Sequence, residues 1–183
     1  MLMELTGQRV RLREFGESDV GALAAIHSDP RVMTYYAPEV GTLEHTRMLV
    51  ETFMQWAEET PRCNFQLAIV DQQTGVLMGS CGVRSKACPR GKAEFGIGIG
   101  STWWGEGIAH EAASMILDFG FSELGLDEVH GVAVAENESV SRFARRLGFT
   151  ARAARLREAW MKERDWRALE WVITRETWNR SVG

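Results

Sequence analysis

The chain has 183 residues, of which 45% are hydrophobic and 25% are charged, and its formal net charge is −4. Its length is that of one domain, and its hydrophobic content is that of a globular protein rather than a disordered one. Charges interrupt the apolar runs, so none predicts a membrane span, and the start lacks the features of a signal peptide. The negative charge argues against general nucleic-acid binding. We therefore expect one cytoplasmic domain over residues 1–183, with neither nucleic acid nor membrane as a partner.

The charge and the cysteines are both informative. Residues 142–167 hold nine basic and three acidic side chains, which form either a solvated basic face or a surface for a phosphorylated or acidic ligand. Cys63, Cys81 and Cys88 form no C-x-x-C pair, which favours structural thiols over disulfides or a metal site. The neighbours His110 and Glu111 have no third ligand at a suitable spacing, so we expect no metal.

The first sixty residues predict one strand and two helices. Val10 and Leu12 alternate with arginines and indicate a strand. Ser18 can cap a helix that an Asp-Pro pair then ends. Thr42 caps a second helix, which Pro61 closes.

The remaining residues predict six more strands and two helices. A hairpin turn at 71–75 joins the first two of these strands, and a polar turn at 162–165 joins the last two. The strands lie near 65–70, 76–83, 93–100, 128–135, 151–161 and 167–175, and the helices near 108–119 and 139–147. This order predicts an α/β fold with a mixed sheet of about seven strands.

The most informative segment joins the strand at 93–100 to the helix after it. Gly105, Gly107 and Ala109 open that helix, where unpaired main-chain N–H groups and the positive end of the helix dipole gather. Small residues let a bulky anion approach this backbone, which predicts a diphosphate cradle. A plain strand–turn–helix that packs tightly on its sheet explains the same residues.

Two common phosphate motifs are absent from this turn. A nucleotide-triphosphatase loop requires G-x-x-x-x-G-K-[ST], and no lysine lies here. A dinucleotide fold requires G-x-G-x-x-G near the start of a βαβ unit, but His110 stands at the third place and the turn lies in mid-chain. The anion is therefore expected to be neither ATP nor NAD.

Two blocks of sequence carry a resemblance to a known family. Residues 103–112 (WWGEGIAHEA) resemble the Q/R-x-x-G-x-G/A signature of the GCN5-related N-acetyltransferase (GNAT) superfamily, in the form typical of its ribosomal-protein alanine N-acetyltransferase (RimJ/RimL-like) subfamily. Residues 136–149 resemble that subfamily's E-N-x-x-S…L-G-F run, and residues 10–19 resemble its opening. The likeness covers nearly the whole chain.

The resemblance implies a bent mixed sheet with helices on both faces, splayed between the fourth and fifth strands, with acetyl-CoA as co-substrate in the splay. It implies main-chain pairing with pantetheine, main-chain amides around the pyrophosphate, and an asparagine that bonds the pantetheine arm. The residues that match these roles are Gly98, Ile99 and Gly100 for pantetheine, Trp104, Gly105, Glu106, Gly107, Ile108 and Ala109 for pyrophosphate, and Asn137 for the arm. Asn137 is equally suited to cap the following helix.

Proton transfer is expected at two further residues. Glu94 matches a catalytic glutamate of several relatives and would deprotonate the attacking amine, best if partial burial raises its pKa. A solvent-facing glutamate or an arginine partner is the alternative. Many relatives protonate the departing thiolate with a tyrosine late in the chain, but both tyrosines here, Tyr35 and Tyr36, lie early. Ala168 replaces a carboxylate of the family's last hairpin, and we expect Ser141 to serve as the acid.

The predicted function is direct transfer of an acetyl group to an amine. The acceptor is either a protein N-terminal amine or a small molecule, and a homodimer is left open. Trp56, Trp160 and Trp166 belong to the core or line an acceptor pocket. A non-catalytic acyl-CoA-binding module with the same fold is the alternative, since the usual acid is missing.

Overall fold

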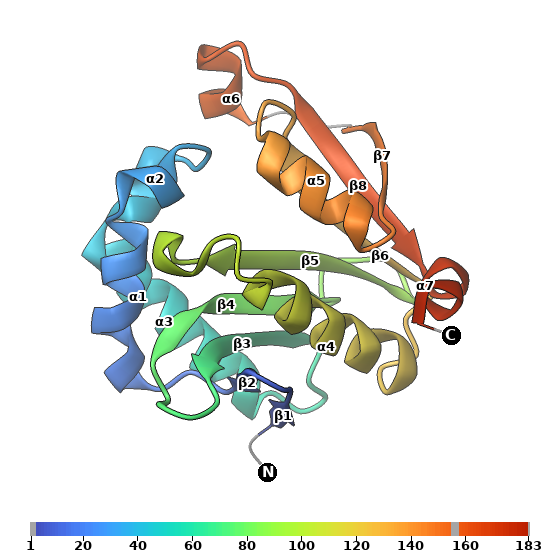
Figure 1. Ribbon diagram of the computed structural model, residues 1–183, viewed down its shortest axis with the longest axis horizontal. Coiled ribbons are helices and arrows are strands. Elements are labelled where there is room, and N and C mark those ends of the chain that lie inside the picture. The colour runs from blue at the N-terminus through green and yellow to red at the C-terminus, as the bar shows by residue number, and fades with distance from the viewer. Residues whose placement is uncertain (1–2, 155–157, 183) are drawn as a thin grey trace.

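The computed structural model describes residues 3–154 and 158–182, in which eight strands form one mixed sheet (Figure 1). Its strand order is β1-β2-β3-β4-β5-β6-β8-β7, with β5 and β6 parallel and every other neighbouring pair antiparallel. The strands are β1 (Glu4–Thr6), β2 (Val10–Arg13), β3 (Asn64–Asp71), β4 (Leu77–Arg84), β5 (Lys92–Ile99), β6 (Glu128–Val134), β7 (Thr150–Ala153) and β8 (Ala168–Thr174).

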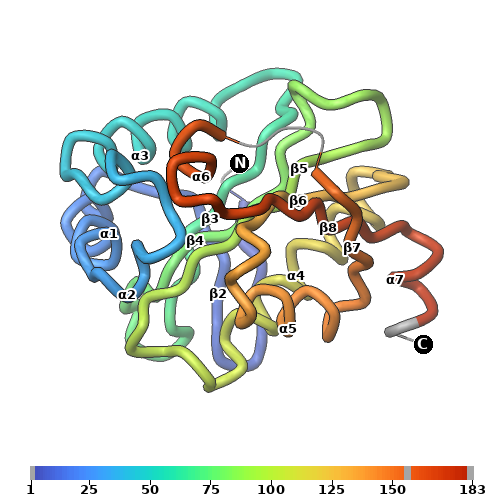
Figure 2. Tube along the Cα trace, turned by 90° about the horizontal axis from the view of Figure 1, so that it is seen from above, coloured from blue at the N-terminus to red at the C-terminus, as the bar shows by residue number. Residues whose placement is uncertain are grey.

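Helices cover both faces of this sheet. Viewed from above, α1 and α3 lie on one side of the strands, and α4 and α5 lie on the other (Figure 2). The α-helices are α1 (Val20–His27), α2 (Pro30–Met33), α3 (Leu43–Glu58), α4 (Ile108–Ser122), α5 (Glu138–Arg146), α6 (Ala159–Glu163) and α7 (Arg175–Val182). Three short 3₁₀ turns are η1 (Glu17–Asp19), η2 (Pro38–Gly41) and η3 (Ser101–Trp103).

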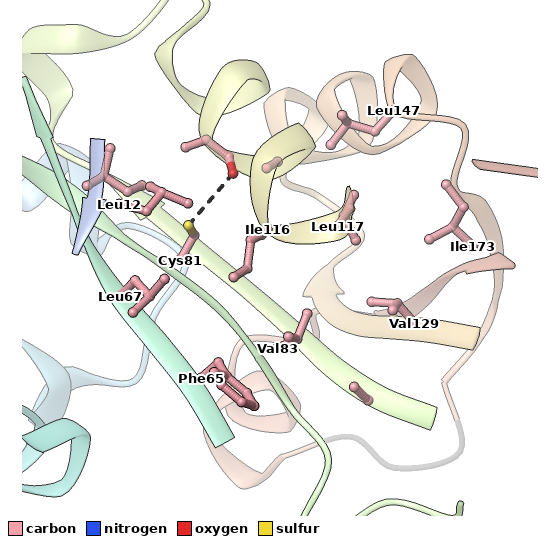
Figure 3. Packing of buried hydrophobic residues seen from close by; sticks show 14 of the residues in the cluster. Leu12, Phe65, Leu67, Cys81, Val83, Ile116, Leu117, Val129, Leu147 and Ile173 are labelled. Carbon is pink, nitrogen blue, oxygen red and sulfur yellow. Dashed lines mark hydrogen bonds between the residues drawn. The ribbon is translucent and has the colours of Figure 1, made fainter. Parts of the chain in front are cut away.

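The main core lies between the sheet and α4. In the predicted apolar stripe of that helix Ala112 and Ile116 are fully buried, Met115 and Phe119 are partly buried, and the helix packs against β2, β4 and β5. Figure 3 shows the Cys81 side chain of β4 directed at this helix, where its thiol contacts the main-chain carbonyl of Ala112. A smaller core on the opposite face joins α1 and α3 to β3 through residues such as Phe53 and Val70. The sheet therefore separates two hydrophobic cores, one on each of its faces.

The predicted fold class is confirmed, but the last hairpin differs from the prediction. The strand predicted near 151–161 is present as β7 but is shorter than predicted, because β7 ends at Ala153 and a helical turn, α6, begins at Ala159. Residues 155–157 of the predicted strand lie outside the described part. Met161 is buried, and its carbonyl accepts a hydrogen bond from the Trp166 N–H at 2.9 Å. Its apolar character thus serves a helical turn rather than a strand. The eighth strand, β1, was not predicted.

The Asp29-Pro30 pair begins a helix rather than only ending one. Proline suits the first position of a helix, where its missing N–H is not needed, and α2 begins at Pro30. The Asp29 carboxylate caps this helix by accepting from the Arg31 N–H at 2.9 Å. The Ser18 cap is also wrong, since Ser18 lies inside η1 and α1 begins at Val20. The Thr42 cap is confirmed, as its hydroxyl accepts from the His45 N–H.

Candidate active site

The sheet opens between β5 and β6. The two strands pair only from Lys92 to Glu94 on β5, opposite residues 128–130 of β6, and no further pair joins them in the described chain. Main-chain groups on the later part of β5 therefore face a gap instead of a neighbouring strand. This gap is the predicted splay. The prediction placed it between the fourth and fifth strands, and these are β5 and β6 because the unpredicted β1 comes first in the chain.

Only alternate residues of β5 can present main-chain groups to this gap. The Gly100 N–H donates to the Met78 carbonyl at 2.9 Å, and the Gly98 carbonyl lies against Gly79 of β4. Since successive residues of a strand point their N–H and C=O groups in opposite directions, Ile97 and Ile99 face the gap. Among the residues predicted to pair with pantetheine, Ile99 therefore presents its main chain to the gap, as Ile97 also does, whereas the main chains of Gly98 and Gly100 face β4.

The Trp104 side chain has a structural role at this edge. Its indole Nε1 donates to the Ile99 carbonyl at 2.9 Å, although the residue as a whole is 51% exposed. The indole satisfies a carbonyl that β6 does not reach and fixes the turn after β5. A tryptophan is therefore a natural replacement for the polar residue of the family signature.

The glycine turn leads directly into α4. Gly105 has φ 81° and Gly107 has φ 80°, values that L side chains rarely adopt. Gly107 is the N-cap residue, and the first main-chain bond of the helix runs from the Glu111 N–H to its carbonyl. The N–H groups of the first helical turn lack partners inside the helix. The expected cradle thus has the backbone geometry of an anion site.

Two residues that sequence reasoning did not place in the site hold this cradle. Glu111 of α4 accepts hydrogen bonds from the main-chain N–H groups of Gln8, at 2.7 Å, and Arg9, at 2.8 Å. The Arg9 guanidinium in turn donates to the Glu106 carbonyl at 2.6 Å and would lie 3.1 Å from a Cβ on Gly107. The turn between β1 and β2 is therefore fastened to the helix N-terminus, and it adds a positive charge there.

A surface hollow adjoins the cradle on the α4 side. Gly107 and His110 line it together with Arg9 from the β1–β2 turn and Arg146 from the end of α5. The two arginines come from distant parts of the chain, so their meeting was not visible in the sequence. Arg146 belongs to the basic segment 142–167 and supports the interpretation that part of this segment faces an acidic ligand.

Glu94 lies on the opposite face of the sheet from the cradle. Its carboxylate accepts from the Arg84 guanidinium at 3.0 Å, and Arg84 also donates to the Gln66 side chain at 2.9 Å. The Glu94 side chain is 53% exposed and paired with an arginine, which are the features of the alternative named for it in the sequence. A Cβ on Gly96 would lie 2.9 Å from Arg84, which places this row of polar groups over the glycine-rich part of β5.

Ser141 lies on α5 and Asn137 is the N-cap residue of this helix, which is on the same side of the sheet as α4 (Figure 2). The Asn137 side chain accepts from the Val140 N–H at 3.2 Å, so its cap role is confirmed. Ser141 is 7% exposed, with its N–H bonded to the Asn137 carbonyl. The structure therefore separates the two predicted proton-transfer residues by the plane of the sheet.

Two of the three cysteines, Cys81 and Cys88, have thiols with a raised pKa. Burial raises the pKa of the Cys81 thiol far above its ordinary value, and burial is also the main reason that the pKa of Cys88 is raised. Neither thiol is thus disposed to act as a nucleophile. Within residues 3–154 and 158–182, no three histidine, cysteine or acidic side chains gather as metal ligands, and no helix is long and apolar enough to cross a membrane.

A fold with a splayed mixed sheet, a glycine cradle at a helix N-terminus and an open strand edge defines an acyl-CoA-dependent transferase. Residues 9–150 match the family model described as "Acetyltransferase (GNAT) domain". The chain belongs to this family and is an acetyl-CoA-dependent N-acetyltransferase.

Known proteins similar to this chain include both uncharacterized and named members. An uncharacterized N-acetyltransferase, YoaA of Bacillus subtilis (strain 168), is 30% identical over 146 residues, which cover 79% of this chain and 81% of YoaA. The spermidine N-acetyltransferase from Vibrio cholerae, solved in complex with CoA and spermine, superposes with a TM-score of 0.77 at 17% identity and covers 94% and 99% of the two chains. The ribosomal-protein-S5-alanine acetyltransferase from Vibrio fischeri does so with a TM-score of 0.74 at 16% identity, covering 96% and 98%. At these identities the two structures establish the fold alone.

Proposed function

We propose that this protein transfers an acetyl group from acetyl-CoA directly to a primary amine, and that the amine is the free N-terminus of a protein or peptide. The observation that carries the proposal is the gap between β5 and β6. The cradle lies on the α4 side of the sheet and the Glu94 row lies on the α1–α3 side. A thioester passing through the gap would meet an amine coming from the other face.

On the α4 side, the proposal assigns the diphosphate to the N–H groups of the glycine turn. A Cβ on Gly107 would crowd the Arg9 guanidinium. The main-chain N–H groups of the turn and this positive charge therefore lie close together, an arrangement that suits an anion. The pantetheine arm would pair with Ile97 and the Ile99 N–H at the open strand edge. Asn137 lies beside this path at the start of α5 and would bond the arm with the part of its amide not used for capping.

On the other side, Glu94 would accept the proton that the ammonium form of the acceptor must lose. An α-amine has an ordinary pKa of about 7.7–8.0, against about 10.4 for a lysine amine. A fraction of α-amines is therefore neutral at pH 7.5 and needs only modest help. Glu94 is exposed and shares its charge with Arg84, an arrangement that suits such an acceptor better than a strongly basic amine.

The charge of the polar row also argues against a polyamine. Among Gln66, Arg84 and Glu94, the single carboxylate is balanced by the single guanidinium. A polyamine carries several positive charges and would gain little from this row. The spermidine enzyme shares the fold of this chain. The acceptor proposed for this chain is instead of the same class as that of the ribosomal-protein enzyme.

The test is turnover of acetyl-CoA with three acceptors. One is a peptide with a free N-terminus, the second is the same peptide with a blocked N-terminus and one lysine, and the third is spermidine. Thiol release and the mass of the product are measured together. We expect acetylation of the first at a rate at least about tenfold above the others. Preference for spermidine or lysine would refute the proposed acceptor, and no thiol release with any amine would indicate a non-catalytic module.

A further inference from the structure

The residue that protonates the departing thiolate is missing from its usual place in the last third of the chain. When the new C–N bond forms and the C–S bond breaks, the sulfur leaves as an anion that must gain a proton. The chain has two tyrosines, Tyr35 and Tyr36. Both follow α2, so a phenol can reach the site only if this N-terminal segment folds over β5.

Tyr36 does fold over β5. Its hydroxyl lies 3.6 Å from the position that a Cβ on Gly98 would occupy. The same side chain lines a small cavity together with Leu23 and Ile26 of α1, Ser80 of β4, and Gly98. The residue as a whole is 40% exposed, so the ring has an exposed edge while its hydroxyl points inward at the strand.

Gly98 is the point of β5 at which this contact matters. It lies between Ile97 and Ile99, whose main-chain groups face the gap proposed for the pantetheine arm. Because Gly98 has no side chain, nothing of its own stands between the hydroxyl and the strand, and a side chain larger than alanine would fill that space. The hydroxyl and the open strand edge thus meet at the same short segment.

We propose that the Tyr36 hydroxyl protonates the coenzyme A thiolate as the C–S bond breaks, an inference that rests on the proposed acetyl transfer. The proton moves from the phenol oxygen to sulfur, the amine proton moves to Glu94 and from there to solvent, and the phenolate regains a proton from solvent. The sum is one amide and one thiol from one amine and one thioester. This assignment replaces Ser141 as the acid.

The surroundings of the hydroxyl keep it in its protonated form. Burial raises the pKa of Tyr36 above its ordinary value. The titratable side chain that shares its cavity is His27, whose pKa is lowered by burial and by His45, so it carries no charge at neutral pH. Arg84 of β4 and Lys92 and Glu94 of β5 are charged groups on the same face of these strands; Arg84 is paired with Glu94, and Lys92 is paired with Glu128. Neutral surroundings disfavour the phenolate.

Tyr36→Phe is the direct test, because it retains the ring and removes only the hydroxyl. We expect kcat to fall about 10- to 100-fold while the KM values for acetyl-CoA and for the acceptor stay within about twofold. Tyr35→Phe is the matched control; the Tyr35 ring packs on Trp166 at 5.3 Å, and kcat should be unchanged. Equal melting temperatures would show that both variants fold as the parent does.

A second measurement separates an acid from a structural hydroxyl. In the Tyr35→Phe background Tyr36 is the only tyrosine, so growth on fluorotyrosine alters this one phenol and makes it more acidic. If Tyr36 is the acid, the fall of kcat at high pH moves to lower pH with the added fluorine. An unshifted profile overturns the proposal.

The kinetics of the single variants distinguish the proposed acid from its alternatives. An unchanged kcat in Tyr36→Phe, or a raised acceptor KM with kcat unchanged, overturns the assignment, the latter in favour of acceptor binding. A larger loss in Ser141→Ala than in Tyr36→Phe returns the role to Ser141. If the parent enzyme acetylates no amine, the proposed function fails as a whole; if it acetylates amines and Tyr36→Phe is fully active, only this inference fails.

Discussion

Replacement of Glu111 tests how the N-terminal turn is fastened to the cradle. The Glu111 side chain is 18% exposed and accepts two short hydrogen bonds from the main-chain N–H groups of Gln8 and Arg9. It also forms an ion pair with the Arg9 guanidinium at 3.2 Å. Hydrogen bonds to charged groups contribute about 1.5–3 kcal/mol each when buried, and an exposed ion pair about 0–1 kcal/mol. Because the donors lie at the surface and can bond water instead, we expect Glu111→Ala to lower the free energy of unfolding by about 2–3 kcal/mol.

The neutral isostere separates the charge from the hydrogen bonds. Glu111→Gln keeps one acceptor oxygen for the main-chain N–H groups and loses the ion pair, so we expect a loss of about 1 kcal/mol. In a chain of this size these losses correspond to about 5–10 °C in Tm for the alanine variant and about 2–4 °C for the glutamine variant. Glu123→Gln, an exposed change at the end of the same helix, is the control and should shift Tm by less than about 2 °C.

The pH dependence has a definite sign. Burial by itself raises the pKa of Glu111, but the hydrogen bonds from the main chain of Arg9, Val10 and Gln8 and from the Arg9 side chain together lower it. A lowered pKa in the folded state stabilises the protein above the unfolded pKa of about 4.3, and this contribution is lost as the pH falls through the folded value. The difference between parent and Glu111→Gln should be full at pH 7 and shrink below about pH 4. A difference of the same size at pH 7 and pH 3 would refute the reasoning.

Three further predictions concern the site itself. Gly107→Val should reduce coenzyme A affinity at least about 100-fold, because a β-branched residue is strained at φ 80° and fills the cradle. Glu106→Ala should leave this affinity unchanged. If calorimetry gives equal affinities for the two variants, the ligand is bound elsewhere. Glu94→Gln should lower kcat about 10²–10⁴-fold with acetyl-CoA affinity unchanged and partial rescue at higher pH, and an unaltered pH–rate profile would return Glu94 to a structural role. Asn137→Ser keeps a helix cap and Asn137→Ala does not. If Asn137 both binds the pantetheine arm and caps the helix, both variants should bind coenzyme A more weakly, but only Asn137→Ala should have a lower Tm.

The elements predicted correctly are those whose signals are local. The apolar stripe of α4 and the caps at Thr42 and Asn137 each follow from residues within a few positions of one another. The failures have the opposite character. The apolar residues near Trp160 fit either a strand or a helical turn, and the packing of Met161 decides between them.

The site divides in the same way. The glycine turn could be found in the sequence because residues 104–109 build it alone, but its fastening by Arg9 joins positions about a hundred residues apart. Likewise, the alternation along β5 that turns Ile97 rather than Gly98 to the gap is decided by which side β4 occupies. Periodicity by itself gives two equivalent faces, and only the neighbouring strand distinguishes them.

This division explains why the family can be identified more readily than the acceptor. The coenzyme side of the gap is built largely by one continuous segment, β5 through the start of α4, so its sequence carries a compact signature. In the proposed function, the acceptor side of the gap is formed by Arg84 on β4 and Glu94 on β5, which contribute one side chain each. A change at any one of these positions can alter the acceptor without changing the signature. If the proposed acceptor side is correct, a short motif is therefore expected to identify the family and not the acceptor.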